Sequence, residues 1–290
     1  MSETETATRE ELIERRMPFM EHLTELRLRL RNACIGLVLT TSVAYVFRGQ
    51  LLKFFSKPLT DSFEKIPVEW RTMNFTSPLE AFMVPFKIAL IGGLFLGMPL
   101  VFHQIWAFIS PGLYPRERRY ALPFIVAAVL LFFGGAGFAY YFVLPKSYAY
   151  FMGYATDTHN IIRDVFTTDV KMNFQIRPMI TLDDYWALTS KLLFIFGAVF
   201  ELPLVLSILS VLGIVSPKML WRFNRYFILV AFVAGAVLTP GDLVVGQVAM
   251  GISLTVLYNI SILVSLLVHR NRRKAAEEDE AGGGGGEVAA

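Results

Sequence analysis

Two carboxylates stand in polar stretches where they could bind a cationic group. Glu25 lies in the acidic and basic stretch Glu21–Arg31, directly before the first long apolar run, and Glu117 lies in a later polar loop. A carboxylate can accept two parallel hydrogen bonds from a guanidinium, so two such groups would select arginine over lysine. Simpler roles stay open: Glu25 pairs with Arg29 at i,i+4 spacing, and Glu117 lies in the first turn of a helix opened by Pro115.

Two further acidic residues lie inside or beside apolar runs. Glu201 is followed closely by Pro203, which frees a backbone carbonyl, and Asp242 stands in a tight turn between two runs. An ionisable group at membrane depth costs several kcal/mol unless it is paired or hydrated, so both residues are functional candidates. The structural alternatives are a hydrogen bond from Glu201 to Gln104 or Gln247 on another helix, and a helix-capping role for Asp242.

The elements that must position these groups are membrane helices. The chain has 290 residues, 54% of them apolar and only 18% charged, with a mean hydropathy of +0.51. This composition is too apolar for a soluble protein of this size and indicates an all-α, polytopic membrane protein. Six transmembrane helices are expected, because six apolar runs occur, at 33–47, 88–115, 120–145, 192–217, 226–241 and 243–268. Helix five, at 226–238, would be only about 20 Å long at 1.5 Å per residue.

The distribution of basic residues predicts the orientation. Lysines and arginines number six in the amino-terminal stretch, three in 109–120, three in 214–225 and four in the tail, against nine in the long loops 48–83 and 146–183. By the positive-inside rule, both termini are cytoplasmic.

The sequence predicts three parts of the chain: an amino terminus, a membrane domain and a tail. Residues 1–16 are expected to be a mobile cytosolic amino terminus, 17–268 the membrane domain, and 269–290 a disordered cytosolic tail. Of the outer loops, 48–83 is expected to hold short interfacial helices broken at Pro58, and 146–184 to form a small cap. No cleavable signal peptide is expected.

The motifs of common enzymes do not occur. The sequence contains no phosphate-binding glycine loop, dinucleotide motif, GxSxG, HExxH or metal-ligand spacing, and its single cysteine, Cys34, cannot form an intrachain disulfide. We therefore expect no enzyme activity, no cofactor, no metal and no nucleic-acid partner. Any work must come from a gradient, a partner or binding energy.

Six motifs in order resemble one family. They are His22–Arg29, Ser77–Phe82 with Lys87, Gln104–Phe108, Pro111–Arg119, Phe200–Pro203 and Leu238–Asp242. Over residues 17–268 the chain resembles TatC, the multi-span receptor of the twin-arginine protein translocase.

The resemblance implies a glove-shaped six-helix receptor in the bacterial cytoplasmic (inner) membrane, with cytosolic termini and two short final helices. It would bind the twin-arginine signal peptides of folded export proteins. Its partners would be small single-span subunits of the TatA and TatB type and other copies of itself, within the lipid bilayer. Transport would draw on the proton-motive force.

The resemblance also assigns expected roles to residues. Signal-peptide binding falls to Glu25 and Glu117, which would hold the signal's arginines, and to Arg27 and Phe108. Transport or partner contact falls to four residues, Glu201, Asp242, Pro58 and Gln104.

Three positions depart from the family pattern. Gly241 stands where a second proline is frequent, Gln247 is displaced by one residue, and Asn259 stands where a glutamate is common. At these positions the partner contacts of helices five and six do not follow from the family pattern. Two other classes of membrane protein fit the sequence less well. An ion-coupled secondary transporter using Glu201 and Asp242 would need pseudo-symmetric halves, and an intramembrane enzyme would need a catalytic constellation; the sequence shows neither.

Overall fold

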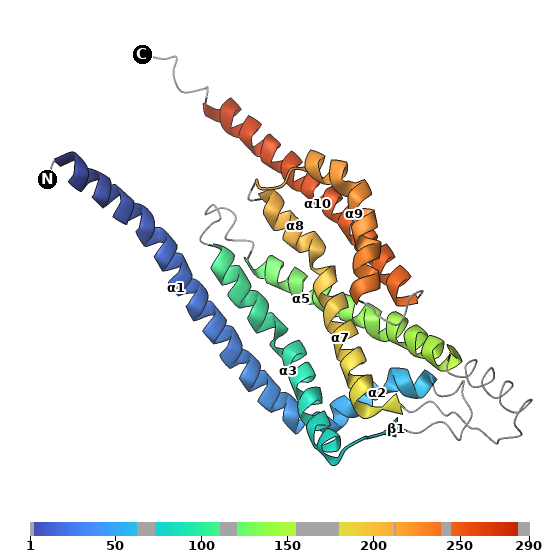
Figure 1. Ribbon diagram of the computed structural model, residues 1–290. Coiled ribbons are helices and arrows are strands. Elements are labelled where there is room, and N and C mark those ends of the chain that lie inside the picture. The colour runs from blue at the N-terminus through green and yellow to red at the C-terminus, as the bar shows by residue number, and fades with distance from the viewer. Residues whose placement is uncertain are drawn as a thin grey trace, which may run out of the picture. The chain divides into compact units, whose positions relative to one another are not determined.

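The computed structural model describes residues 3–62, 73–110, 121–154, 180–211, 213–238 and 245–283. Within these ranges the chain is helical apart from one pair of two-residue strands and short turns (Figure 1). The helices are α1 (Glu3–Val46), α2 (Arg48–Ser62), α3 (Pro78–Ile109), α5 (Ala121–Phe138), the π-helical segment η4 (Ala139–Val143), α7 (Leu182–Phe200), α8 (Leu202–Val211), α9 (Pro217–Leu238) and α10 (Val245–Gly283). Residues 144–154 continue as helix after η4, and the strands are β1 (Met73–Asn74) and β2 (Ile180–Thr181).

The prediction of an all-α, polytopic chain is confirmed. Five helices in the described ranges are long and apolar enough to cross a membrane, and six if the bent pair of α1 and α2 counts as one span. α1 and α2 meet at an angle of 85°. The last two candidate spans have 21 and 22 residues, against 29 to 33 for the three before them. The two final spans are therefore shorter than those three, as expected.

The surfaces of these helices suit a lipid environment. Large apolar side chains remain widely exposed, for example Leu122 at 70%, Leu229 at 67% and Val237 at 69%. Exposed apolar surface of this extent on long apolar helices is favourable in hydrocarbon and unfavourable in water.

The predicted start of helix five at residue 226 is wrong. α9 begins at Pro217, after a cap in which the Ser216 hydroxyl accepts a hydrogen bond from the Met219 amide at 3.3 Å. Serine before a helix and proline at its first position form a recognised start signal. The three basic residues of 214–225 therefore lie on the first turns of α9 rather than in a loop.

Two helices extend beyond their expected ends. α1 begins at Glu3, within the stretch 1–16 expected to be a mobile amino terminus. α10 continues to Gly283, through much of the tail expected to be disordered. Both extensions are rich in Glu and Arg, which are strong helix formers. Most of the expected cap in the second long loop, 155–179, lies outside the described residues.

The chain forms two compact units, Met1–Leu51 with Pro85–Val129 and Leu52–Val84 with Leu130–Ala290. In the first unit, α1 and α3 pack through small residues. A Cβ at Gly93 would lie 2.6 Å from the backbone nitrogen of Thr41, and one at Gly97 would lie 2.8 Å from a Leu37 methyl carbon. The Thr40 hydroxyl donates to the Gly93 carbonyl oxygen at 2.8 Å. Such contacts let membrane helices approach closely.

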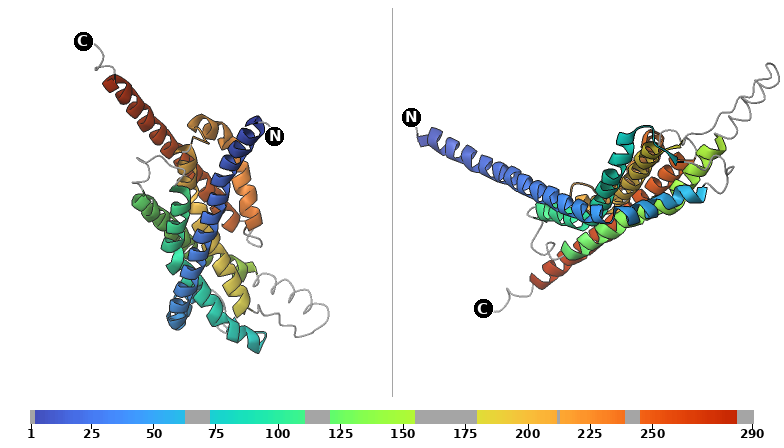
Figure 2. Two further views of the ribbon diagram at one scale, coloured as in Figure 1. Left: turned by 90° about the vertical axis from the view of Figure 1, so that its left-hand side faces the viewer. Right: turned by 90° about the horizontal axis from the view of Figure 1, so that it is seen from below.

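In the second unit, α9 and α10 run side by side (Figure 2). The Tyr258 hydroxyl donates to the Leu220 carbonyl oxygen at 3.0 Å, and the Tyr258 ring stacks on Phe227 at 3.9 Å between centroids. The Asn224 amide donates to Asn259 Oδ1 at 3.1 Å. Asn259, one of the departures from the family pattern, therefore joins these two helices to each other.

Candidate functional site

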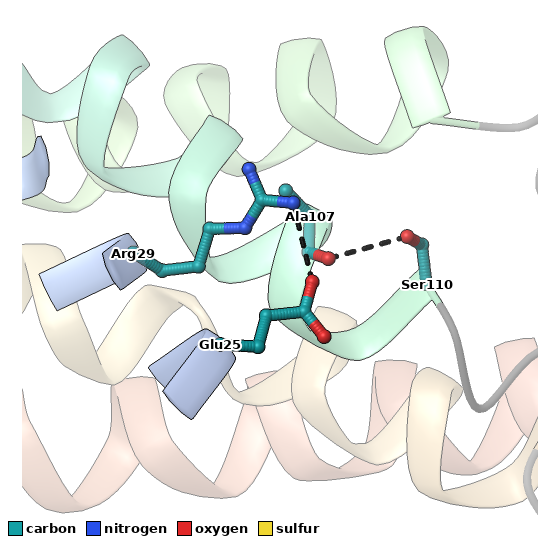
Figure 3. A network of polar contacts seen from close by, with 4 residues as sticks. All are labelled: Glu25, Arg29, Ala107 and Ser110. Carbon is teal, nitrogen blue, oxygen red and sulfur yellow. Dashed lines mark hydrogen bonds and ion pairs between the residues drawn. The ribbon is translucent and has the colours of Figure 1, made fainter. Parts of the chain in front are cut away.

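Glu25 and Arg29 form an ion pair on one face of α1. Arg29 Nη2 donates to Glu25 Oε1 at 3.2 Å, and the side chains are 27% (Glu25) and 31% (Arg29) exposed. Figure 3 shows both side chains pointing from α1 toward the last turn of α3, where the Ser110 hydroxyl bonds the Ala107 carbonyl. The i,i+4 pair considered from sequence is confirmed.

An aromatic contact fixes α1 against α3 in the same region. His22 and Phe108 stack with ring centroids 4.4 Å apart and an angle of 22° between the planes. Phe108 belongs to α3 and is half-buried, whereas His22 is exposed on α1. His22 lies one helical turn before Glu25 on α1, so the stack places Phe108 in the same region of the chain's first unit as Glu25.

Two polar atoms in this unit are buried without a hydrogen-bond partner among the described residues, Arg29 Nε and Gln104 Oε1. Arg27 is exposed and forms no ion pair within the described part of the chain. Glu117 lies in the stretch 111–120, outside the described residues.

The other end of α3 holds a carboxylate that the sequence analysis did not single out. Glu80 Oε2 accepts hydrogen bonds from the Thr76 amide at 2.6 Å and the Thr76 hydroxyl at 2.9 Å. The Ser77 hydroxyl accepts from the Leu79 amide at 3.1 Å, and Pro78 is the first helical residue. This is a variant of the capping box, in which an N-cap serine and a glutamate at the third helical position satisfy free amides.

Glu80 also joins the start of α3 to the start of α7. Its Oε1 accepts from the Asp183 amide at 2.8 Å, across 103 positions of sequence. Beside it, β1 and β2 pair in parallel, with Met73 opposite Ile180 and Asn74 opposite Thr181. The signal that could have revealed Glu80 is the Ser-Pro-Leu-Glu spacing, although its distant partner has no signature in the sequence.

Pro58 is buried in the middle of α2, and its position explains a second network. Proline has no amide hydrogen, so it cannot bond the carbonyl four residues earlier, which belongs to Phe54. The Tyr140 hydroxyl, from η4, donates to that carbonyl oxygen at 2.6 Å, and its ring stacks on Phe54 at 4.7 Å. The Tyr185 hydroxyl donates to the next carbonyl, that of Phe55. Because Pro58 has no amide hydrogen, the Phe54 carbonyl in α2 can accept a hydrogen bond from Tyr140. This bond holds α2 against η4.

Glu201 lies at the break between α7 and α8. Its amide bonds the Ala198 carbonyl at 3.1 Å, and its carboxylate Oε1 is buried with no hydrogen-bond partner in the described ranges. Gln247, one of the partners considered for it, donates instead to the Phe232 carbonyl at 3.4 Å. Asp242 and Gly241 lie in 239–244, outside the described residues. No group of three or more His, Cys, Asp or Glu in the described ranges could hold a metal ion.

Comparison with known proteins gives a consistent result. The model of the family described as Sec-independent protein translocase protein (TatC) matches residues 21–252. Curated TatC proteins from Desulforapulum autotrophicum and Aquifex aeolicus are 36% and 35% identical, covering 86% and 88% of this chain and 84% and 98% of their own lengths.

Solved structures match as well. A crystal structure described as the twin arginine translocase receptor TatC is 32% identical, with a TM-score of 0.65, and the match covers 86% of this chain and 99% of that one. A second structure of that receptor, in DDM, has a TM-score of 0.66 and the same identity, over 84% of this chain and 99% of its own. The chain therefore belongs to the TatC family of Sec-independent protein translocase proteins, which are multi-pass membrane components of a translocase and not enzymes.

Proposed function

We propose that this protein is the receptor and core subunit of a twin-arginine translocase, and that its cytosolic face binds the twin-arginine signal peptide of folded export proteins. The observation that supports this most is the Glu25 carboxylate. It lies on the face of α1 that points toward the end of α3, one turn from His22, which stacks on Phe108, and a single guanidinium neutralises it. A carboxylate in this setting already binds the chemical group that the signal peptide would present.

In this proposal Glu25 accepts one signal arginine and Glu117 accepts the other. A guanidinium offers two parallel donors to a carboxylate, whereas an ammonium acts as a point charge, and this difference gives preference for arginine. Phe108 offers an apolar surface next to the carboxylate, and Arg27 lies exposed on the same helix, where it can bond peptide carbonyls.

The remaining roles follow from the same proposal. The bacterial inner membrane holds the protein with both termini in the cytoplasm, as the excess of basic residues on one side favours. Partners are single-span subunits of the TatA and TatB type and other copies of the chain, and the proton-motive force drives transport. The four residues proposed for transport or partner contact are Glu201, Asp242, Pro58 and Gln104.

Site-specific photocrosslinking tests the receptor role. A twin-arginine signal peptide carrying a photoreactive residue beside the arginine pair is irradiated with membranes that contain wild type, Glu25→Gln or Glu117→Gln. A twin-lysine peptide is the matched control. The proposal expects strong crosslinking of the twin-arginine peptide to wild type, and much weaker crosslinking to either variant or with the twin-lysine peptide. Undiminished crosslinking to both variants would show that the carboxylates do not bind the signal.

A further inference from the structure

We propose that Arg29 is a resident competitor for the signal arginine, so that binding exchanges one guanidinium for another on Glu25. This inference rests on the receptor function proposed above and concerns the regulation of the same site. In the receptor without a signal peptide, Arg29 would neutralise the Glu25 carboxylate. It would therefore lower the affinity of Glu25 for a signal arginine that binds through both carboxylate oxygens. It would also speed release of the signal, because it can return to Glu25 without diffusion.

The geometry of the resident pair is that of a weak, replaceable contact. Only Nη2 of Arg29 and only Oε1 of Glu25 take part, at 3.2 Å. Charge-assisted bonds of optimal geometry are shorter, at about 2.7–2.9 Å, and arginine often makes two of them to one carboxylate. Arg29 Nε is buried and has no partner within the described residues. The pair therefore uses a fraction of the bonding capacity of both groups.

An incoming guanidinium and an incoming ammonium meet this pair differently. A guanidinium that binds Glu25 through both oxygens must displace Arg29 from Oε1, so it competes with the resident group. An ammonium that contacts the second oxygen alone can bind while Arg29 remains. Removal of Arg29 should therefore favour arginine peptides more than lysine peptides.

The frame of the site does not depend on Arg29. His22 and Phe108 hold α1 against α3 by stacking, and the close approach of the two helices at Gly93 and Thr40 lies further along the pair. A change at Arg29 should therefore alter the charge on Glu25 without moving the helix that presents it.

Peptide affinity measured by fluorescence anisotropy, with the full-length protein in nanodiscs, tests the inference. The ligands are twin-arginine and twin-lysine signal peptides, and the variants are Arg29→Gln, Arg29→Lys and Arg31→Gln. Arg31 is the matched control, because it is exposed on the same helix and forms no ion pair in the described part of the chain. Its removal reports the general effect of one lost positive charge.

We expect Arg29→Gln to bind the twin-arginine peptide about threefold more tightly than wild type, since an i,i+4 pair on a helix is worth a factor of about two and repulsion adds to it. Arg31→Gln should give a smaller gain, equal for both peptides, and Arg29→Lys should stay near wild type. A gain for Arg29→Gln no larger than that for Arg31→Gln, or weaker binding, would overturn the inference.

The Glu25→Gln background separates this inference from the receptor proposal. If Glu25→Gln alone binds the twin-arginine peptide as wild type does, the proposed function fails. If Glu25→Gln weakens binding but Arg29→Gln gives no specific gain, only the competitor role of Arg29 fails. The inference requires that the gain from Arg29→Gln disappear when Glu25 is replaced.

Discussion

Glu80 lies at the start of α3, and Glu25 lies on α1 near its contact with α3. Their carboxylates accept hydrogen bonds from different kinds of donor. Glu80 uses both oxygens, and its donors include two backbone amides, those of Thr76 and Asp183. Among the described residues, Glu25 has one side-chain donor, Arg29, on one oxygen. Main-chain donors cannot swing away without unfolding the segment that bears them, whereas a side chain can rotate to another partner.

The difference separates a structural carboxylate from one that can bind a ligand. Glu80 fixes the starts of α3 and α7, and replacing its donors would disrupt both helix ends. Glu25 can exchange Arg29 for an external guanidinium at little cost to the fold, because an i,i+4 pair on a helix contributes only about 0.3–0.5 kcal/mol. Glu201 resembles neither, since one of its oxygens is buried without a partner among the described residues.

The largest effect on stability should come from Glu80→Ala. This change removes the hydrogen bonds from Thr76 and Asp183 to a charged group, which we expect to lower the free energy of unfolding by about 2–4 kcal/mol. Thermal denaturation in detergent, followed by circular dichroism, measures it. Glu25→Ala is the matched control and should cost less than about 1 kcal/mol. Equal shifts for the two variants would contradict the distinction between the two glutamates.

Gly93→Ala should alter the packing of α1 against α3 near Glu25 and leave the hydrogen bonds of Glu80 unchanged. The added Cβ would lie 2.6 Å from the Thr41 backbone nitrogen, so α1 and α3 must move apart, at a cost of about 1–3 kcal/mol. Gly134→Ala is the control, because a Cβ there meets no atom within 4 Å. Thermal midpoints and peptide crosslinking are both measured. If Gly93→Ala matched the control in both, the α1–α3 contact would not support the site.

A double-mutant cycle on Pro58 and Tyr140 tests whether α2 is held through a carbonyl that proline sets free. Tyr140→Phe should cost about 1 kcal/mol in wild type, because the Phe54 carbonyl then loses its donor. In the Pro58→Ala background the backbone amide introduced at that position can bond the same carbonyl, so Tyr140→Phe should cost less. Thermal midpoints of the four proteins give the coupling, and an equal cost in both backgrounds would refute it.

The fold was largely predictable because hydropathy is a local property. Runs of apolar residues long enough to cross a bilayer indicated six spans, and the Glu25–Arg29 pair followed from i,i+4 spacing alone. Apolarity alone does not locate the start of α9, because its first turns carry three basic residues; the start signal is Ser216-Pro217, of the same kind as Ser77-Pro78.

The contacts between distant segments could not be predicted. Asp183 lies 103 positions from Glu80, and Tyr140 lies 86 positions from Phe54, and no periodicity in one segment specifies its partner in another. Pro58 illustrates the limit. The resemblance assigns it to transport or partner contact, which stays a proposal, and nothing in its own segment indicates that the Tyr140 hydroxyl bonds the Phe54 carbonyl.

Glu25→Gln should have the smallest effect on stability and the largest effect on signal-peptide binding. It therefore tests most directly the claim that Glu25 binds the signal peptide. One preparation is used for photocrosslinking of the twin-arginine peptide and for thermal denaturation. The account predicts that crosslinking is lost while the free energy of unfolding stays within about 0.5 kcal/mol of wild type. Retained crosslinking, or loss that accompanies a clearly lowered thermal midpoint, would contradict the claim that Glu25 is a binding rather than a structural carboxylate.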